Sequence, residues 1–203
     1  LIPSLLSIGW RPEWKEAIFK AELPGVNKFQ KVVRTALGMM PISFSALKLT
    51  ADDTADVIAK MRQAKVNSIR GFPTALLVIA DEMKRKGWRF PVKLVRAYGE
   101  GLSPARAQVI EEVFDCKVYR DYGGSEAMHI GHECNKFTGY HLDLARFYVE
   151  VLKDGKPAKP GESGEIVVTC FHNHAMPFVR YRIGDLGTLA DPHEPCRCGN
   201  RTP

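Results

Sequence analysis

The sequence lacks the features that would place the chain in a membrane or in the secretory pathway. No apolar run approaches the roughly 20 residues that a membrane-spanning helix needs. The apolar start, Leu1 to Leu6, is too short for a signal peptide and has no basic leader. We therefore expect a cytoplasmic protein without a membrane partner. An initiator Met is also absent, so we expect an internal piece of a longer protein.

Cysteine is scarce, and its odd count argues against a disulfide framework. There are five cysteines, namely Cys116, Cys134, Cys170, Cys196 and Cys198. Two of them form a C-x-C pair, which fits a cytosolic protein with metal-binding thiols. Cys116 and Cys170 fall in strand-like segments and are expected to be buried thiols.

The chain has no internal repeat, no low-complexity stretch and no concentrated charge of one sign. Its net charge is +6, but the basic residues are scattered. The densest basic group, Lys84 to Arg89, lies at the end of a predicted helix, where cations complement the helix dipole. We expect no nucleic-acid partner.

Helix and strand patterns alternate about every ten residues between positions 50 and 125, which predicts βα units and a mainly parallel sheet. The predicted helices cover 52–64, 74–86 and a segment that begins at Ser103-Pro104; the predicted strands cover 66–70, 92–97 and 117–120. Residues 1–45 mix apolar clusters with prolines and are predicted to form short helices joined by turns.

The pattern changes after about residue 136. Residues 147–152, 166–171 and 178–181 read as strands separated by glycine-containing turns. The fold class is therefore α/β, with a mainly parallel βα subdomain at 1–135 and an antiparallel or barrel-like β subdomain at 136–203.

Residues 121–126 form the first motif with chemical meaning. Two glycines after a strand let the backbone approach a ligand closely, and the Ser125 hydroxyl can donate to a phosphate. The Glu126 carboxylate can hold Mg²⁺, and the Tyr122 ring can stack on a base. A glycine turn with a solvated glutamate explains the segment equally well when it is taken alone.

The second motif is Arg180 to Leu186. Asp185 follows a glycine and can accept hydrogen bonds from both hydroxyls of a ribose. A surface turn between arginines is the competing interpretation. The two motifs lie about 60 residues apart, and together they are far more specific than either alone.

This pair resembles the Y-G-x-[ST]-E and R-x-G-D motifs of the adenylate-forming acyl-CoA synthetase superfamily. Further matches resemble its phenylacetate–CoA ligase and capsular-polysaccharide-type branch. They are the turn at 71–74, the G-E loop at 99–101, the G-E-I-V-V-T segment at 164–169, the R-Y-R segment within 177–182 and the C-x-C-G segment at 196–199.

The resemblance implies an AMP-forming acid–CoA ligase, which joins a small carboxylic acid to CoA through an acyl-adenylate formed from ATP. It assigns adenine stacking to Tyr122, the α-phosphate to Ser125, Mg²⁺ to Glu126 and the ribose to Asp185. The other nucleotide-site residues that it implies are Gly99, Glu100, Gly101, Asp121, Gly123 and Gly124. It also allows a homodimer. Catalysis would consist mainly of positioning and charge neutralisation.

Two catalytic parts of that family are not found in the sequence, namely its phosphate loop and its lysine-bearing small domain. Gly124 also departs from the commoner residues at its position in the first motif. We therefore expect little ligase activity from this chain alone. An adenylyl transferase that does not use CoA and a non-catalytic, zinc-stabilised binding module remain alternatives.

A structural zinc site is predicted from three cysteines and one histidine. Cys196 and Cys198 supply two thiolates, and Cys134 is the best-placed third. His141 or His132 could complete the set, and the resemblance favours His141. His172 and His174 have no further ligand at a suitable spacing and are expected to be polar loop residues.

Overall fold

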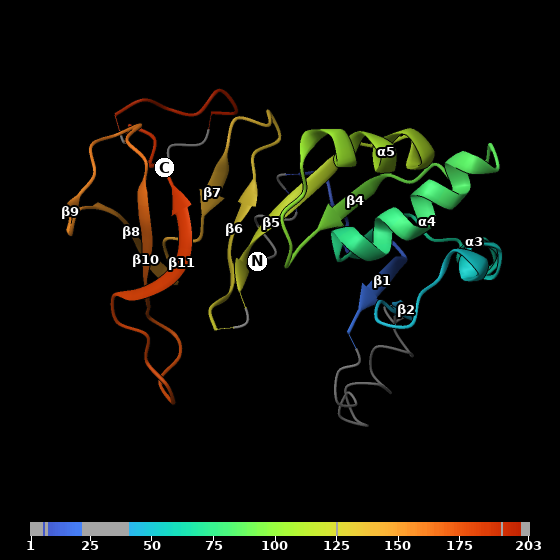
Figure 1. Ribbon diagram of the computed structural model, residues 1–203, viewed down its shortest axis with the longest axis horizontal. Helices are drawn as coiled ribbons and strands as arrows, with labels where there is room; N and C mark the ends of the chain where they lie inside the picture. Colours follow the sequence, from blue (N-terminus) through green and yellow to red (C-terminus); the bar gives the residue numbers. More distant parts are fainter. Residues whose placement is uncertain (1–5, 7, 22–40, 125, 192, 200–203) are drawn as a thin grey trace. The chain divides into compact units, whose positions relative to one another are not determined.

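The computed structural model describes residues 6, 8–21, 41–124, 126–191 and 193–199 (Figure 1). Contacts divide the chain into two units, residues 2–120 and 121–203. This division falls earlier than the predicted boundary at residue 135, and the assignment of nucleotide loops to a subdomain at 1–135 stays a prediction. No helix in the described part of the chain has both the length and the apolar character to cross a membrane.

The first unit is built on parallel strands, as predicted. They are ordered β2-β1-β3-β4-β5. The strands are β1 (Glu16–Lys20), β2 (Ile42–Ser45), β3 (Ser68–Gly71), β4 (Leu94–Ala97) and the start of β5 (Val118–Gly124). The helical segments are η1 (Ala51–Asp53), α3 (Thr54–Gln63), α4 (Pro73–Arg85) and α5 (Pro104–Phe114). The mainly parallel βα arrangement is thereby confirmed.

The helices begin where the sequence places their start signals. Ser103 caps α5 through its side chain, which accepts from the backbone N–H of Arg106, and Pro104 is the first helical residue. The apolar stripe of α4 is fully buried against the sheet, and it consists of Leu76, Ile79, Ala80 and Met83. Helix periodicity thus correctly identified the core face.

The prediction of short helices within residues 1–45 is wrong for the described residues 16–20 and 42–45, which form β1 and β2. Ala17, Ile18 and Phe19 are all buried, so β1 shows no alternation of apolar and polar residues. A short strand covered on both faces has the same apolar pattern as a buried helix segment. Residues 22–40 lie outside the described part.

The second unit is antiparallel. After its boundary with the first unit, β5 pairs with β6 (Met128–Glu133), and β6 pairs with β7 (Tyr140–Leu142). A separate four-stranded sheet has the order β11-β10-β8-β9. Its strands are β8 (Phe147–Lys153), β9 (Lys156–Pro157), β10 (Gly164–Cys170) and β11 (Tyr181–Gly187). An apolar cluster that includes Ile130, Phe147 and Val168 forms the core of this unit.

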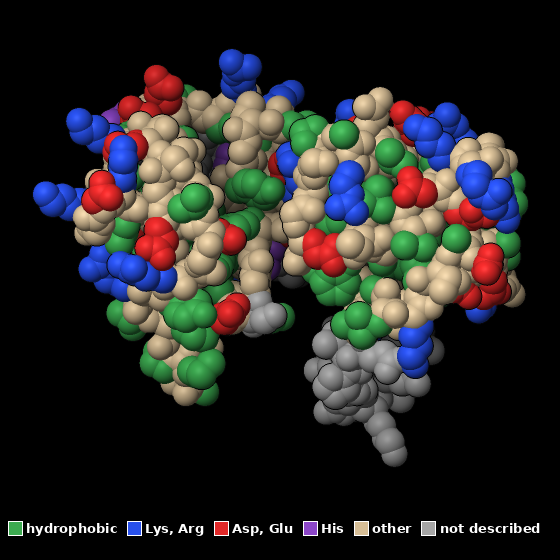
Figure 2. All heavy atoms as spheres, viewed as in Figure 1, with side chains coloured by type: hydrophobic (Ala, Val, Ile, Leu, Met, Phe, Trp, Pro, Cys, Tyr) green, Lys and Arg blue, Asp and Glu red, His purple; other side chains and the backbone are tan. Residues whose placement is uncertain are grey.

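Charged side chains of both signs are interspersed on the face shown in Figure 2. The densest basic group of the sequence is largely engaged in ion pairs. Arg85 and Lys86 both contact Glu82, and Lys84 contacts Glu112 on α5. These cations therefore belong to a helix end paired with neighbouring carboxylates.

Candidate functional site

Strand β5 does not end before the glycine-rich motif, as the sequence predicted, but continues through it to Gly124. Its register with β6 shifts between Tyr122 and Gly123. A Cβ on Gly123 would lie 1.7 Å from the backbone oxygen of Met128, so only glycine allows this close approach. The irregular pairing redirects the strand beside Tyr122.

The second motif also lies in a strand. The predicted strand at 178–181 is wrong, because β11 begins at Tyr181 and contains Asp185. The pairing between β10 and β11 is irregular opposite Ile166, and Gly184 adopts a φ of +90°. This irregularity breaks the two-residue alternation on which strand prediction depends, and it re-aims the side chain of the neighbouring Asp185.

The two motifs meet directly. The Tyr122 hydroxyl donates a hydrogen bond of 2.9 Å to Oδ2 of Asp185, across a sequence separation of 63 residues. The fold thus brings together the ring predicted to stack on adenine and the carboxylate predicted to bind ribose.

A second contact joins the same motifs. The Tyr181 hydroxyl lies 3.4 Å from Oε1 of Glu126, the residue predicted to hold Mg²⁺. Glu126 is exposed, so its carboxylate is accessible to an ion. Ser125, the predicted α-phosphate ligand, lies outside the described residues.

Tyr122 is half-buried and packs against the apolar cluster of the second unit. Its ring also lies beside Tyr140, with centroids 5.8 Å apart. Burial raises the pKa of Tyr122, and the hydrogen bond to the Asp185 carboxylate raises it further. The phenol therefore stays protonated and acts as the donor.

The predicted adenine-lining loop, Gly99-Glu100-Gly101, belongs to the first unit. Glu100 accepts hydrogen bonds from the Thr74 backbone N–H at 3.0 Å and from its hydroxyl at 2.9 Å. Gly99 adopts a φ of +78°, and a Cβ there would lie 2.8 Å from the Phe72 ring. The carboxylate of Glu100 thus holds the loop against the start of α4.

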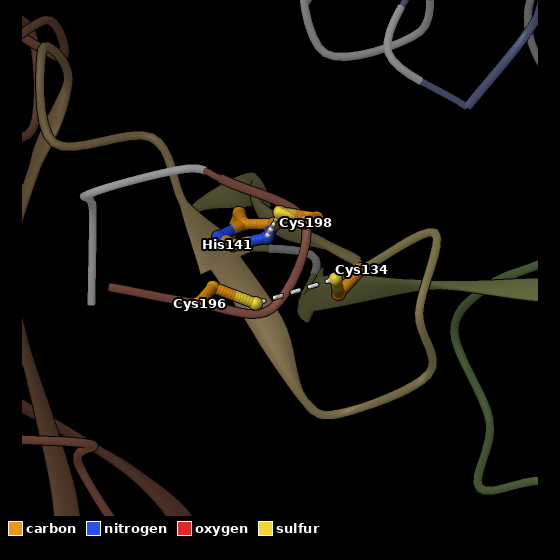
Figure 3. Close-up of side chains that lie close together, drawn as sticks. All are labelled: Cys134, His141, Cys196 and Cys198. Carbon is orange, nitrogen blue, oxygen red and sulfur yellow. Dashed lines mark hydrogen bonds between the residues drawn. The ribbon is translucent and has the colours of Figure 1, made fainter. Parts of the chain in front are cut away.

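The four favoured metal ligands converge in the second unit (Figure 3). The ligand atoms of Cys134, His141, Cys196 and Cys198 all lie within 4.8 Å of one another. Two close pairs define the cluster: the sulfurs of Cys134 and Cys196 are 3.5 Å apart, and Nε2 of His141 lies 3.2 Å from the sulfur of Cys198. This group of three thiols and one imidazole could hold a metal ion.

The donor set fits tetrahedral zinc. Zinc–sulfur bonds of about 2.3 Å place tetrahedral sulfurs about 3.8 Å apart, close to the observed separation. The backbone N–H of Lys136 lies 3.3 Å from the Cys134 sulfur and supports it as an acceptor. The C-x-C-G segment closes a turn through a hydrogen bond of 2.8 Å from the Gly199 N–H to the Cys196 carbonyl, with Gly199 at a φ of +86°.

Local hydrogen bonds favour the thiolate form of Cys196. They lower its pKa to about 6, first through the Cys198 backbone N–H and next through the Thr138 hydroxyl. Metal ligation requires the thiolate, so these donors already favour the ligating form.

His132 lies beside the cluster rather than in it. It is paired in register with His141 across β6 and β7, and the two rings have centroids 5.8 Å apart. Burial, and after it the neighbouring His129 and His141, together lower the pKa of His132 to about 4, so the ring is neutral at physiological pH. Of the two histidines left open by the sequence, the one inside the described cluster is His141.

No family model matches the chain. It is similar to a phenylacetate–coenzyme A ligase of Thermus thermophilus, with 31% identity over 136 residues, which are 63% of this chain and 30% of the relative. It is also 24% identical over 133 residues to an indoleacetate–lysine synthetase of Pseudomonas savastanoi, which are 64% of this chain and 31% of that relative. The chain spans about a third of the length of these curated relatives.

Solved structures show the same fold. A 2-hydroxyisobutyryl-CoA ligase in complex with 2-HIB-AMP and CoA matches 98% of this chain and 45% of its own, with a TM-score of 0.78 and 18% identity. The chain is phenylacetate–CoA ligase-like in sequence, and it has the fold of part of the large domain of adenylate-forming acyl-CoA ligases.

The sequence pointed to the ring of Tyr122 but not to the contact of its hydroxyl with Asp185, and it gave no role to Tyr181. Tyr181 lies within the R-Y-R segment, but no local pattern predicted its contact with Glu126, 55 residues away. Thr138 was also missed, although its hydroxyl lies 3.3 Å from the Cys196 sulfur. Both contacts join residues that are more than 50 positions apart, and such contacts have no signal in the local sequence.

Proposed function

We propose that this chain supplies the adenosine side of the nucleotide site in an ATP-dependent acid–CoA ligase. The parent reaction would convert a carboxylic acid and ATP into an acyl-adenylate and pyrophosphate, and then form a thioester with CoA. The observation that carries this proposal is the Tyr122–Asp185 hydrogen bond, because it joins two nucleotide motifs that are distant in sequence.

The chemistry of each side chain supports a distinct role. A carboxylate offers about four lone-pair positions, so Asp185 can accept from Tyr122 and still accept from both ribose hydroxyls. Tyr122 presents an aromatic ring for adenine, and Ser125 is assigned to the α-phosphate. Glu126 offers an exposed oxygen ligand for Mg²⁺, which neutralises phosphate charge when it is bound.

The glycines and neighbouring backbone complete the proposed site. Gly123 and Gly124 let the chain pass close to the nucleotide, and Asp121 precedes Tyr122 on the same strand. The family resemblance also assigns the Gly99-Glu100-Gly101 loop to the nucleotide. We expect the 203-residue chain to bind nucleotide without completing ligation, and a pyrophosphate-exchange assay with robust turnover would contradict this.

We also propose that the ligand set of Cys134, His141, Cys196 and Cys198 binds structural zinc. Four protein ligands leave no open position for a substrate, so the ion would act as a cross-link. It would tie the β6–β7 region to the C-x-C-G turn, two segments that are distant in sequence.

The acceptor of the acyl group is the least determined part of the reaction. One curated relative is named for CoA and another for lysine, so likeness to this superfamily does not specify CoA. An acyl-adenylate-forming enzyme with a different acceptor is therefore the second candidate.

Calorimetric titration of the chain with ATP and Mg²⁺ tests the proposed function. We expect Asp185→Asn to weaken binding about tenfold or more, because the neutral amide loses charge-assisted acceptance from the ribose. Asp154→Asn is a matched control, since Asp154 lies in the β8–β9 turn at a φ of +50°, which asparagine tolerates. Equal affinity of the parent chain, Asp185→Asn and Asp154→Asn for ATP would count against the proposed nucleotide site.

A further inference from the structure

The two motifs exchange hydrogen bonds in a reciprocal arrangement. The first motif contributes a tyrosine, Tyr122, to the carboxylate of the second motif. The second motif contributes a tyrosine, Tyr181, to the carboxylate of the first motif. Each acidic residue assigned to a ligand is thus contacted by a phenol from the other motif.

Both carboxylates lie where regular strand pairing gives little support. Asp185 follows Gly184 in the irregular part of β11, and Glu126 lies beyond the end of β5. Both side chains are exposed. An exposed acidic side chain on irregular backbone samples several rotamers, so a directional donor restricts it strongly.

The two phenols differ in how firmly they are held. Tyr122 is half-buried, packs against the apolar cluster and makes the shorter contact, at 2.9 Å. Tyr181 is 36% exposed and lies 3.4 Å from Glu126, and its ring packs against Phe178 with centroids 4.9 Å apart. Each ring has an apolar packing partner, and the Tyr122 ring is held more firmly than the Tyr181 ring.

Neither phenol blocks its carboxylate. Tyr122 donates to Oδ2 of Asp185, and Tyr181 lies against Oε1 of Glu126. One donor occupies one of about four lone-pair positions on a carboxylate, which leaves the remaining positions for ribose hydroxyls or a cation.

We propose that Tyr122 and Tyr181 are positioning residues, each orienting one ligand-binding carboxylate: Tyr122 orients Asp185 toward the ribose, and Tyr181 orients Glu126 toward Mg²⁺. This inference rests on the proposed nucleotide site. It adds that ribose recognition and metal recognition depend on different tyrosines, each from the motif opposite to its carboxylate.

Binding measurements on the 203-residue chain can separate the two roles. The variants are Tyr122→Phe and Tyr181→Phe, which keep the rings and remove only the hydroxyls. Tyr148→Phe on β8 is the matched control, since Tyr148 is 57% exposed and belongs to the same antiparallel sheet as Tyr181. The probes are ATP, 2′,3′-dideoxy-ATP and Mg²⁺, and each protein is first checked for native circular dichroism.

We expect opposite patterns from the two variants. Tyr122→Phe should weaken ATP binding about tenfold, change dideoxy-ATP binding little and leave the Mg²⁺ midpoint unchanged. Tyr181→Phe should raise the Mg²⁺ midpoint about threefold and preserve the preference for ATP over dideoxy-ATP. Tyr148→Phe should match the parent chain in every titration.

Three outcomes would overturn the inference. Unchanged ribose preference in Tyr122→Phe and unchanged Mg²⁺ dependence in Tyr181→Phe would show that the hydroxyls are dispensable, while the nucleotide site itself would stand. A lower Mg²⁺ midpoint in Tyr181→Phe would show that the phenol competes with the cation. Failure of the parent chain to bind ATP·Mg²⁺ at all would reject the proposed function together with this inference. Tyr181 is partly exposed, so Tyr181→Phe should fold even if Tyr122→Phe does not. The Mg²⁺ titration of Tyr181→Phe then still decides between the outcomes.

Discussion

Glu100 shows that a residue assigned to a ligand can also be required by the fold. Helix α4 begins at Pro73, and its N-cap residue, Phe72, has no side chain that can accept a hydrogen bond from the first turn. The Glu100 carboxylate takes that role from 26 residues away by accepting from the Thr74 N–H and hydroxyl. A negative charge at this position also complements the helix dipole.

We predict that Glu100→Ala lowers the free energy of unfolding by about 1 kcal/mol, the usual value of a helix cap. Glu100→Gln should cost less, because its amide oxygen still accepts a hydrogen bond. Chemical denaturation of these variants, alone and combined with Thr74→Ala, measures the coupling between the two residues. Additive effects in the double variant would show that the hydroxyl contact contributes nothing, and an unchanged stability of Glu100→Ala would show the same of the cap as a whole.

The candidate site could be predicted residue by residue only where a residue carries its own chemical signal. Asp185 and Glu126 were named because their two motifs occur together, and the metal-ligand set was named because a C-x-C pair of thiols has few other uses. Tyr181 was missed, since a tyrosine between two arginines has many structural roles, and the hydroxyl contact of Tyr122 was missed because it depends on a residue 63 positions away. The choice of His141 over His132 came from a family resemblance, because spacing alone permitted both.

At the scale of elements, α4 carries an ion-pair group at its end. Glu82 is largely buried and contacts Arg85 at 2.7 Å and Lys86 at 3.0 Å. Hydrogen bonds from Arg85 and then Lys86 lower the pKa of Glu82 to about 2 from its usual 4.5. A carboxyl whose pKa is lower in the folded state stabilises the fold above its unfolded pKa.

We therefore predict that Glu82→Gln destabilises the chain at pH 7 and that the difference shrinks as the pH falls. The stabilisation should be complete above about pH 4.5 and should disappear as the pH approaches 2, because Glu82 is then protonated in both states. Melting temperatures of the parent chain and the variant at pH 7, 4.5 and 3 test this. A constant difference across that range would exclude the ion-pair explanation.

The pairing of β5 with β6 depends on a glycine. A Cβ on Gly123 would clash with the Met128 backbone oxygen, which cannot move without separating the strands. We predict that Gly123→Ala lowers the free energy of unfolding by about 1–3 kcal/mol. Gly101→Ala is the control, because no atom lies within 4 Å of a Cβ there. Equal stability of the two variants in denaturant titrations would argue against this pairing.

The fold was predictable where elements follow a regular period. The helices α4 and α5 carry apolar stripes and start signals, so their positions followed from the sequence. Strand β11 could not be delimited, because its bulge interrupts the alternation. Strand β6 was not predicted, since its glycine and two histidines, Gly131, His129 and His132, resemble a loop. These segments become strands through pairing with residues distant in the sequence, because their own residues carry no clear strand pattern.

At the scale of the whole molecule, a metal cross-link would join segments separated by about 60 residues. We predict about one equivalent of zinc per chain, and a stabilisation of about 3–4 kcal/mol when free zinc exceeds its Kd by 100- to 1,000-fold. Cys198→Ser should abolish both effects, and Cys116→Ser should preserve them, because Cys116 lies outside the cluster. Elemental analysis measures the zinc content, and thermal melts with and without a chelator measure the stabilisation. Identical zinc content in the two variants would reject the proposed ligand set.

The central claim is that residues 121–126 and 180–186 form one nucleotide site. A crystal structure of the chain with AMP tests it most directly. We expect both ribose hydroxyls to lie within hydrogen-bonding distance of the Asp185 carboxylate, and the adenine ring to lie against Tyr122. A nucleotide bound elsewhere, or a ribose that points away from Asp185, would contradict it.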